Sequence, residues 1–230
     1  MLTHLACVMD GNRRWAKKRG LFPWDGHREG VTAAQRTVDY CLAKNIPYLT
    51  LYTFSVENLK RSFEEKSFLF DLIAKFVTDV LLADYRDRGV CVKFIGDRSL
   101  FPEQLRGVFE RVERETAYGT VLTVHLLFCY GGQQEIVAAA RTLAEHVARG
   151  ELTPAAITKE LFAATLWSGS IPAPDLVIRT GGNQRLSNFL SYQSAYSELY
   201  FSDTFWPDVD EKFLDAALLY FESSKRNFGA

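Results

Sequence analysis

One acidic residue and several basic residues lie close together near the start of the chain, in the stretch HLACVMDGNRRWAKKRG from His4 to Gly20. A short apolar run with β-strand character ends at Asp10, and a basic helical segment follows Asn12. The five cations of that segment are Arg13, Arg14, Lys17, Lys18 and Arg19. We expect a buried strand to deliver one carboxylate to a sheet edge, beside the free N–H groups of a helix start. Such a site suits a pyrophosphate and an accompanying metal ion.

Simpler explanations compete with an anion site at this stretch. An Asp-Gly pair after a strand is most often only a turn. Five basic residues in seven usually form a solvated helix face or a nucleic-acid patch. Nucleic acid is disfavoured as a partner, because the whole chain carries a net charge of −1 and the basic run lacks interleaved exposed aromatic residues.

Length and composition predict one soluble globular domain that spans residues 1–230, with 47% hydrophobic and 24% charged residues. The four cysteines are scattered and form no CxxC pair, which favours reduced, buried thiols in the cytoplasm. No signal peptide is recognisable, and no apolar run approaches the roughly 18 residues of a membrane-spanning helix. We therefore expect a cytoplasmic protein that is neither exported nor integral to a membrane.

Apolar runs with β character alternate with helical patterns along the chain. After the first run, strands are expected at residues 48–54, 90–95, 121–129, 175–178 and 198–201. Pro23 and Gly26 mark a loop, and helices are expected at 27–44, 62–88, 102–116, 133–148, after an N-cap at Thr153, and after Pro207. This alternation predicts an α/β fold with a mostly parallel central sheet of about six strands flanked by helices.

Polar and glycine-rich clusters follow the expected strands at the ends where ligands bind in such sheets. These clusters span residues 10–12, 55–58, 96–97, 130–132 and 179–187. A random scatter would have placed functional residue types at strand starts as well. The convergence therefore favours an anion site over an ordinary turn.

Several phosphate chemistries are excluded by missing motifs: the chain has no GxxxxGK[ST], no GxGxxG opening a helix and no GxSxG. An aspartate-nucleophile phosphatase would need an acid where Asn12 stands. What remains are two arginine clusters, with Asp10 and Glu198 as ligands for a hard cation such as Mg²⁺. The clusters are Arg13, Arg14 and Arg61 in one, and Arg179 and Arg185 in the other. Two cationic clusters predict two bound diphosphates.

The helix expected at 62–88 has an apolar surface wider than that of an ordinary surface helix. It is either wedged between the sheet and neighbouring elements, or placed at a dimer face, or it walls a cavity for an apolar ligand. The aromatic-rich segment 191–206 is similarly either core or interface.

Long motifs in order along the chain identify a family resemblance. They are MDGNRRWAKKRG, the Gly26-His27 pair, LTLYTFSVENLKR, VKFIGD, YGG, DLVIRTGGNQRLSNFL, AYSELYF and FWPD. Over essentially its full length the chain resembles the cis-prenyltransferases. The resemblance implies a homodimeric, Mg²⁺-dependent enzyme that repeatedly condenses isopentenyl diphosphate with farnesyl diphosphate. The product is a long cis-polyprenyl diphosphate, the lipid carrier for cell-wall sugars, although the sequence does not fix its length and a synthase of different chain length is an alternative. Release of the product implies peripheral membrane contact, although no amphipathic anchor is evident.

The resemblance also implies residue roles. Asp10 matches the essential aspartate that handles Mg²⁺ and diphosphate, and Glu198 matches the second metal ligand. The residues matched to the allylic diphosphate are Gly11, Asn12, Arg13, Arg14, Trp15, His27 and Arg61; those of the second motif are Ser55, Val56, Glu57, Asn58 and Leu59; those of the isopentenyl diphosphate clamp are Arg179, Arg185, Leu186 and Ser187. The helix 63–85 and the strand 122–128 would line an apolar tunnel for the growing chain.

Asn58 is the family's named proton acceptor, but a neutral amide is a feeble base. We therefore assign proton removal to a diphosphate oxygen and a positioning role to Asn58.

Several residues depart from the family pattern. Pro23 replaces an arginine, Leu59 a tryptophan, Cys129 an asparagine, Asn183 an acid and Asn227 an arginine. These changes predict weakened substrate affinity, although the retained aspartate and clamp arginines predict catalysis. A non-catalytic partner subunit of the same fold, which would be expected to lack those residues, is disfavoured. A trans-prenyltransferase is excluded, because the chain contains no Asp-Asp pair.

Overall fold

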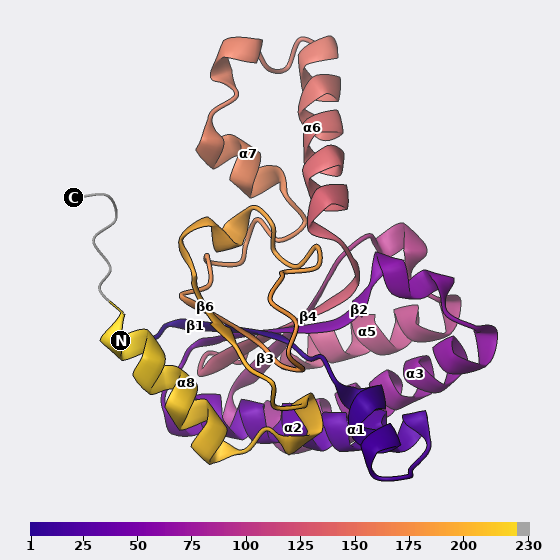
Figure 1. Cartoon of the computed structure of the whole chain (residues 1–230). Helices are drawn as coiled ribbons and strands as arrows, with labels where there is room; N and C mark the ends of the chain where they lie inside the picture. The colour runs from indigo at the N-terminus through magenta and orange to yellow at the C-terminus, as the bar shows by residue number, and fades with distance from the viewer. Residues whose placement is uncertain (225–230) are drawn as a thin grey trace.

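Six parallel strands form the central sheet, in the order β3-β4-β2-β1-β5-β6 (Figure 1). The computed structural model describes residues 1–224, and every strand pairing in that range is parallel. The strands are β1 (His4–Val8), β2 (Tyr48–Ser55), β3 (Val90–Ile95), β4 (Leu122–Tyr130), β5 (Leu176–Arg179) and β6 (Glu198–Phe201). The predicted α/β fold with a parallel sheet of six strands is thereby confirmed.

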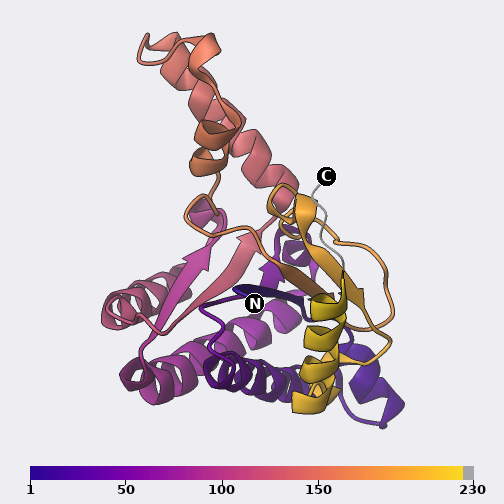
Figure 2. The same cartoon turned by 90° about the vertical axis from the view of Figure 1, so that its left-hand side faces the viewer.

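Helices cover one face of this sheet. A long loop and the first turn of the helix that begins at Gly132 cover the other. The helices are α1 (Asn12–Lys18), α2 (Pro23–Ala43), α3 (Phe63–Lys75), α4 (Ala83–Tyr85), α5 (Glu103–Thr116), α6 (Gly132–Ala148), α7 (Lys159–Thr165) and α8 (Glu211–Ser223). In Figures 1 and 2, α2 and α3 lie beneath the sheet, whereas α6 and α7 project from the opposite side as an arm. Phe189 and Leu190 pack over β1 and β5 on the face nearest the arm.

Burial explains why the strands read as nearly continuous apolar runs. All five residues of β1 are buried, as are eight of the nine residues of β4. A strand at the centre of a parallel sheet is covered on both faces, so its side chains must be apolar on both. Even the polar residues His4 and Thr50 are fully buried, and they hydrogen-bond to each other at 2.8 Å between Nε2 and Oγ1.

The second helix begins earlier than its sequence predicts. Pro23 and Gly26 do not form a loop; they are the first and fourth residues of α2. Gly26 is required by a close approach between helices, because a Cβ atom there would lie 2.0 Å from the backbone oxygen of Asn12. Proline is favoured at a first helical position, so both residues mark a helix start that packs against α1.

The long helix expected at residues 62–88 is present and continuous. Ser62 caps it by accepting a hydrogen bond from Glu65 N at 3.2 Å, and Gly89 ends it in the left-handed conformation at φ 77°. Its middle, Phe76–Leu82, is a π-helical segment, a feature frequent at functional sites. Thr153 is the N-cap of a 3₁₀ turn, Pro154–Ala156, without a side-chain cap hydrogen bond, and the α-helix that follows, α7, begins later and is capped by Thr158.

Other expectations concern the cysteines and the membrane. All four cysteines are buried and unpaired, in agreement with reduced thiols. Within residues 1–224, no helix has the length and apolar character needed to cross a bilayer. The departure at Asn227 lies outside the described residues.

Candidate active site

Asp10 lies just beyond the carboxyl end of β1. The two strands beside β1 come from distant parts of the chain. β2 pairs with β1 on one side and β5 pairs with it on the other. Backbone contacts fix the residue: Asp10 N donates to Val8 O at 3.0 Å, and Asp10 O accepts from Trp206 N at 3.0 Å. This is the crevice at which open parallel sheets bind ligands.

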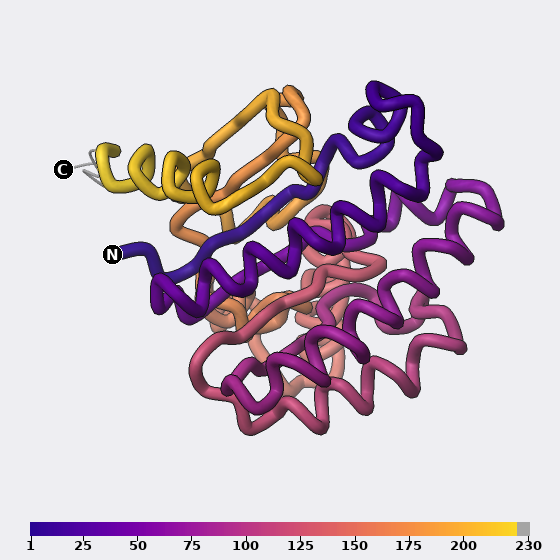
Figure 3. Tube along the Cα trace, turned by 90° about the horizontal axis from the view of Figure 1, so that it is seen from below, coloured from indigo at the N-terminus to yellow at the C-terminus, as the bar shows by residue number. Residues whose placement is uncertain are grey.

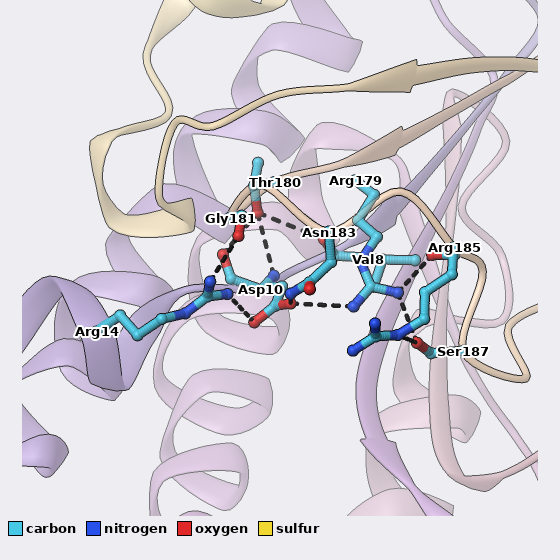
Figure 4. Close-up of polar contacts among 9 residues, drawn as sticks. All are labelled: Val8, Asp10, Arg14, Arg179, Thr180, Gly181, Asn183, Arg185 and Ser187. Carbon is cyan, nitrogen blue, oxygen red and sulfur yellow. Dashed lines mark hydrogen bonds and ion pairs between the residues drawn. The ribbon is translucent and has the colours of Figure 1, made fainter.

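Three donors converge on the Asp10 carboxylate (Figure 4). Oδ1 accepts from Arg14 Nη2 at 2.9 Å, and Oδ2 accepts from Arg179 Nη2 and from Asn183 Nδ2, both at 3.0 Å. Burial opposes ionisation of the carboxyl group, but the hydrogen bonds from Asn183 and Arg179 and the charge of Arg14 outweigh it. The pKa of Asp10 is therefore lowered, and the group is an anion at neutral pH.

Arg179 is the last residue of β5, and its side chain is only 5% exposed. Its guanidinium joins Asp10 to the following loop, because Nη1 donates to Ser187 Oγ at 2.6 Å and to the backbone oxygen of Arg185. Arg185 Nε donates to the same Ser187 hydroxyl at 3.2 Å (Figure 4). The structure thus brings the predicted clamp residues together around one buried cation.

Two adjacent clefts open at this edge, and Asp10 and Arg61 line both. The first cleft has a volume of about 680 Å³. It is lined by residues of the stretch MDGNRRWAKKRG, and also by Pro23, His27 and Arg61. Its lining residues include Gly11, Asn12, Arg13, Arg14 and Lys17. Four cations in one cleft match the predicted site for an allylic diphosphate.

The second cleft has a volume of about 610 Å³ and lies on the β5 side of Asp10. Residues from both strand exits beside β1 line it, namely Ser55, Glu57, Asn58, Arg179, Arg185, Ser187 and Asn188. The pair of clefts agrees with the two diphosphate sites predicted from the arginine clusters.

Two residues that line the first cleft each have a buried polar atom without a hydrogen-bond partner among the described residues. The atoms are His27 Nε2 and Asn12 Oδ1. Burial and the nearby charges of Arg61 and Arg13 lower the pKa of His27 to about 4, so the imidazole is neutral at physiological pH. A neutral imidazole and an amide in this position can bind a ligand without adding charge.

Some predicted substrate-binding residues do not reach the clefts. Trp15 turns away and donates from Nε1 to Asp208 at 2.6 Å, beside the 3₁₀ turn Trp206–Asp208. Leu59 packs against the core beneath the sheet, and Leu186 packs against the core on the other face. Val56 contributes a methyl group near Gly131. Their predicted roles toward substrate stay predictions.

Glu198 is not brought to Asp10 within one chain. It opens β6 and pairs with Leu176 at the start of β5, whereas Asp10 follows the opposite ends of the strands. Arg179 pairs with Phe201 on β6, and Glu198 lies three residue steps before Phe201, which corresponds to about 10 Å along the strand. Strand register therefore keeps Glu198 apart from Asp10 within one chain, and its role as a metal ligand stays a prediction.

The donor set suits a metal ion held mainly by substrate. Residues 1–224 contain no group of three or more histidine, cysteine or acidic side chains arranged for a metal ion. Mg²⁺ bound with a phosphate substrate typically uses only one or two protein carboxylates. Asp10 supplies one at the junction of the clefts, so a Mg²⁺–diphosphate complex fits the residues present.

Two asparagines have structural roles that the sequence did not reveal. Asn183, noted only as a departure, donates to Asp10. Asn188 has a left-handed backbone at φ 67° and donates from Nδ2 to Glu57 at 2.9 Å and Gln134 at 2.8 Å. Its Oδ1 accepts from Gln133 N at 2.7 Å. Asparagine tolerates positive φ, and that was the only available signal.

An apolar cavity of about 70 Å³ lies beneath the first cleft. Its lining includes Leu69, Leu72, Ile73 and Phe76 of the long helix, but its sheet contribution comes from Leu51 and Thr53 of β2. Leu122 and Phe128 of β4 are buried in the core. The tunnel for a polyprenyl chain therefore stays a prediction that requires the cavity to widen.

Fold and site together define a parallel α/β protein with two adjacent cationic clefts that share Asp10. The chain matches the prenyltransferase family described as "Putative undecaprenyl diphosphate synthase" over residues 8–229. It is 44% identical over 226 residues to the farnesyl-diphosphate-specific ditrans,polycis-undecaprenyl-diphosphate synthase of Xanthomonas axonopodis pv. citri, covering 98% of this chain and 88% of the relative.

Solved structures agree with this match. Lavandulyl diphosphate synthase from Lavandula x intermedia, in complex with dimethylallyl diphosphate, has a TM-score of 0.94 at 34% identity, covering 100% of this chain and 98% of that one. A probable undecaprenyl diphosphate synthase from Campylobacter jejuni has a TM-score of 0.83 at 32% identity, covering 100% and 99%. The chain belongs to this prenyltransferase family, and the protein is a prenyltransferase.

Proposed function

We propose that the protein condenses isopentenyl diphosphate repeatedly with farnesyl diphosphate to make a long cis-polyprenyl diphosphate, namely undecaprenyl diphosphate for the cell-wall lipid carrier. The relatives named for farnesyl-diphosphate-specific undecaprenyl diphosphate synthesis support this choice of substrates. According to the same proposal, the protein acts in the cytoplasm as a homodimer and depends on Mg²⁺.

One observation carries the proposal: a single carboxylate, Asp10, lines both clefts and is held between cations of each. Arg14 of the first cleft and Arg179 of the second bind its two oxygens at 2.9 and 3.0 Å. Two diphosphates bound in these clefts would be neighbours, so their hydrocarbon portions can react with each other.

The first cleft suits the diphosphate that leaves. Ionisation of an allylic diphosphate places additional negative charge on the departing group. Arg13, Arg14 and Arg61 hold positive charge at that position before the reaction begins, and such preorganised charge lowers the barrier. Arg13 and Arg61 also share Glu65, at 3.7 and 3.0 Å, which fixes their positions.

The second cleft suits the isopentenyl diphosphate that attacks. Arg179, Arg185 and Ser187 bind its diphosphate, and the alkene then adds to the allylic carbon in the first cleft. As the new C–C bond forms, the allylic diphosphate departs into the first cleft, and the isopentenyl unit then loses a proton from C2 to a diphosphate oxygen, which restores a double bond, while Asn58 positions the substrate. Asn58 Oδ1 is engaged by Ser55 N at 3.3 Å, which leaves its N–H₂ group as a donor.

Mg²⁺, when bound with diphosphate at Asp10, would supply further charge neutralisation for the leaving group. Asp10 is already ionised at neutral pH because of its lowered pKa, so it can take up a cation without first losing a proton. Arg14, Arg179 and Asn183, which donate to Asp10, must then share its carboxylate with the metal ion or move away from it.

The test is incorporation of labelled isopentenyl diphosphate into extractable product with farnesyl diphosphate as primer, with and without Mg²⁺. Wild-type protein should give a ladder of Mg²⁺-dependent products, and Asp10→Asn, which keeps the shape but removes the charge, should lose at least about 100-fold in rate. Absence of any wild-type elongation, with both diphosphates still bound, would favour a non-catalytic partner subunit.

A second variant separates positioning from catalysis at Asn58. Asn58→Ala should lower turnover, because the isopentenyl group is no longer oriented. Near-normal turnover would remove the positioning role.

A further inference from the structure

Eight consecutive residues are exposed where α1 ends and α2 begins, in the sequence KKRGLFPW over residues 17–24. The first three are cations and the last four are apolar. Leu21 is 45% exposed, Phe22 69% and Trp24 39%. We call residues 17–24 the basic–aromatic turn. Contiguous exposed apolar residues on a folded protein usually mark an interaction site.

The turn carries positive charge that the protein does not neutralise. No acidic residue occurs from Gly11 to Trp24. Arg19 pairs with Asp208 at 3.0 Å, whereas Lys17 and Lys18 form no ion pair within residues 1–224. An anionic partner surface would therefore meet two available ammonium groups beside the apolar residues.

The apolar side chains are presented by a well-packed support. The Trp24 ring lies 5.9 Å from that of Phe68 on α3, and the Arg28 guanidinium lies 5.5 Å above the same ring. Asp25 accepts a hydrogen bond from Phe22 N at 3.1 Å. Burial of Phe22 in a partner would thus require little ordering of the backbone.

The turn also occupies an accessible position beside the first cleft. Lys17, Gly20, Leu21 and Pro23 line that cleft. Figures 1 and 3 show the turn at the periphery of the molecule, and in Figures 1 and 2 it lies at the end opposite the arm of α6 and α7. A flat surface can therefore reach the turn and the cleft mouth together.

We propose that the basic–aromatic turn docks the protein on an anionic lipid bilayer. Leu21, Phe22 and Trp24 enter the interfacial region, and Lys17 and Lys18 face the lipid phosphates. This inference rests on the proposed function, since a polyprenyl diphosphate made in the first cleft is an amphiphile that must pass into a bilayer. Nucleic acid fits less well, because only Phe22 and Trp24 of the turn offer rings for base stacking, whereas the exposed apolar side chains of Leu21 and Pro23 suit the acyl-chain boundary of a bilayer.

Vesicle flotation without any substrate tests the proposal. The protein should float with vesicles of phosphatidylcholine mixed with phosphatidylglycerol, and less with phosphatidylcholine alone. Phe22→Ser should weaken binding about tenfold, through loss of buried apolar area. Lys17→Gln/Lys18→Gln should weaken it about 25-fold, at about fivefold for each charge. Phe22 is the N-cap of α2, where serine is favoured, so folding is preserved.

Matched variants elsewhere serve as controls. Tyr118, which is 93% exposed, can be changed to serine, and the exposed Lys159 and Lys212 can be changed together to glutamine. Both control proteins should bind vesicles like the wild type.

Three results would overturn the proposal: a wild type that does not float with anionic vesicles, Phe22→Ser binding as tightly as wild type, or Phe22→Ser changing the oligomeric mass. The last would identify the turn as a contact between copies of the chain. The proposed function is judged separately by elongation in detergent, so an active protein that fails to float would refute docking alone.

Discussion

Asp10 and Arg179 form an ion pair at the boundary between the two clefts, with 3.0 Å between Oδ2 and Nη2. The arginine side chain is 5% exposed and the aspartate side chain 30%. Arg179 is therefore held within the protein, whereas Asp10 remains accessible from the clefts. Because Arg179 also holds Ser187, one guanidinium links the carboxylate shared by both clefts to the loop that walls the second. Binding in one cleft is thereby connected to the geometry of the other.

Replacement of Arg179 should damage the second cleft more than the first. Arg179→Met removes one partner of a largely buried pair, which costs about 3–5 kcal/mol. We expect kcat/KM for isopentenyl diphosphate to fall at least about 100-fold, with a smaller change in the KM for farnesyl diphosphate. Steady-state kinetics with each substrate varied in turn measures this. Arg98→Met, which breaks an exposed pair with Glu113, is the matched control and should leave both constants near wild type. Equal losses for both substrates would contradict the assignment.

Asn188 should act as a positioning residue for the second cleft. Asn188→Gly keeps the left-handed backbone but removes the hydrogen bonds to Glu57, Gln134 and Gln133, so we expect the KM for isopentenyl diphosphate to rise about tenfold. Asn188→Ala should also lower the melting temperature, because alanine is strained at φ 67°.

Asn188→Asp gives the sharpest version of this test. The aspartate would place a carboxylate against the acceptor oxygens of Glu57 and Gln134. The KM of this variant for isopentenyl diphosphate should therefore exceed that of Asn188→Gly. An unchanged KM in Asn188→Asp would show that these contacts do not position the substrate.

The contact between α1 and α2 should tolerate no side chain at Gly26. A Cβ in Gly26→Ala would lie 2.0 Å from Asn12 O, and relief of that overlap should cost about 1–3 kcal/mol and displace the first cleft wall. Gly107→Ala is the matched control, since nothing lies within 4 Å of its Cβ position on α5. It should be neutral or stabilising by up to about 1 kcal/mol. Thermal unfolding of the two variants, with opposite shifts, checks the prediction.

Stability should fall in mildly acidic solution because two histidines are buried in neutral form. Burial lowers the pKa of His4 to about 4 and that of His125 to about 3, from an ordinary value of 6.5. Above pH 6.5 neither state binds these protons. As the pH falls from about 6.5 to 4 the unfolded chain takes them up and the folded protein does not, so unfolding becomes easier by about 3 kcal/mol for each histidine.

Denaturant unfolding between pH 4 and pH 8 measures this loss. His125→Gln should flatten the decline, whereas the same change at His146, whose side chain is 43% exposed, should not. A wild-type stability independent of pH across this range would show that the two imidazoles are not held neutral.

The sequence predicted the strands well because parallel strands covered on both faces must be apolar, and β1 and β4 show that requirement directly. It also predicted Asp10 and the arginine clamp, since polar residues at strand exits share one edge of the sheet. The position of Glu198 within the chain could not be predicted in the same way. Its residue type suits a metal, but only the pairing with Leu176 reveals that it lies at the strand start.

Contacts between distant segments account for the other differences. Gly26 reads as a loop residue, whereas its real constraint is the Asn12 backbone, which lies on another helix. Trp15 belongs to a matching motif, yet its indole hydrogen-bonds to Asp208 at the far end of the chain. Periodicity and local motifs carry no information about such partners.

The most direct measurement is a single turnover with labelled farnesyl diphosphate bound to excess enzyme and then chased with isopentenyl diphosphate and Mg²⁺. If two diphosphates occupy the clefts that share Asp10, the label should move into products extended by whole isoprene units, and Asp10→Asn should retain it as farnesyl diphosphate. Label that stays as farnesyl diphosphate in the wild type, or is released as the free alcohol, would contradict prenyl transfer between the two clefts.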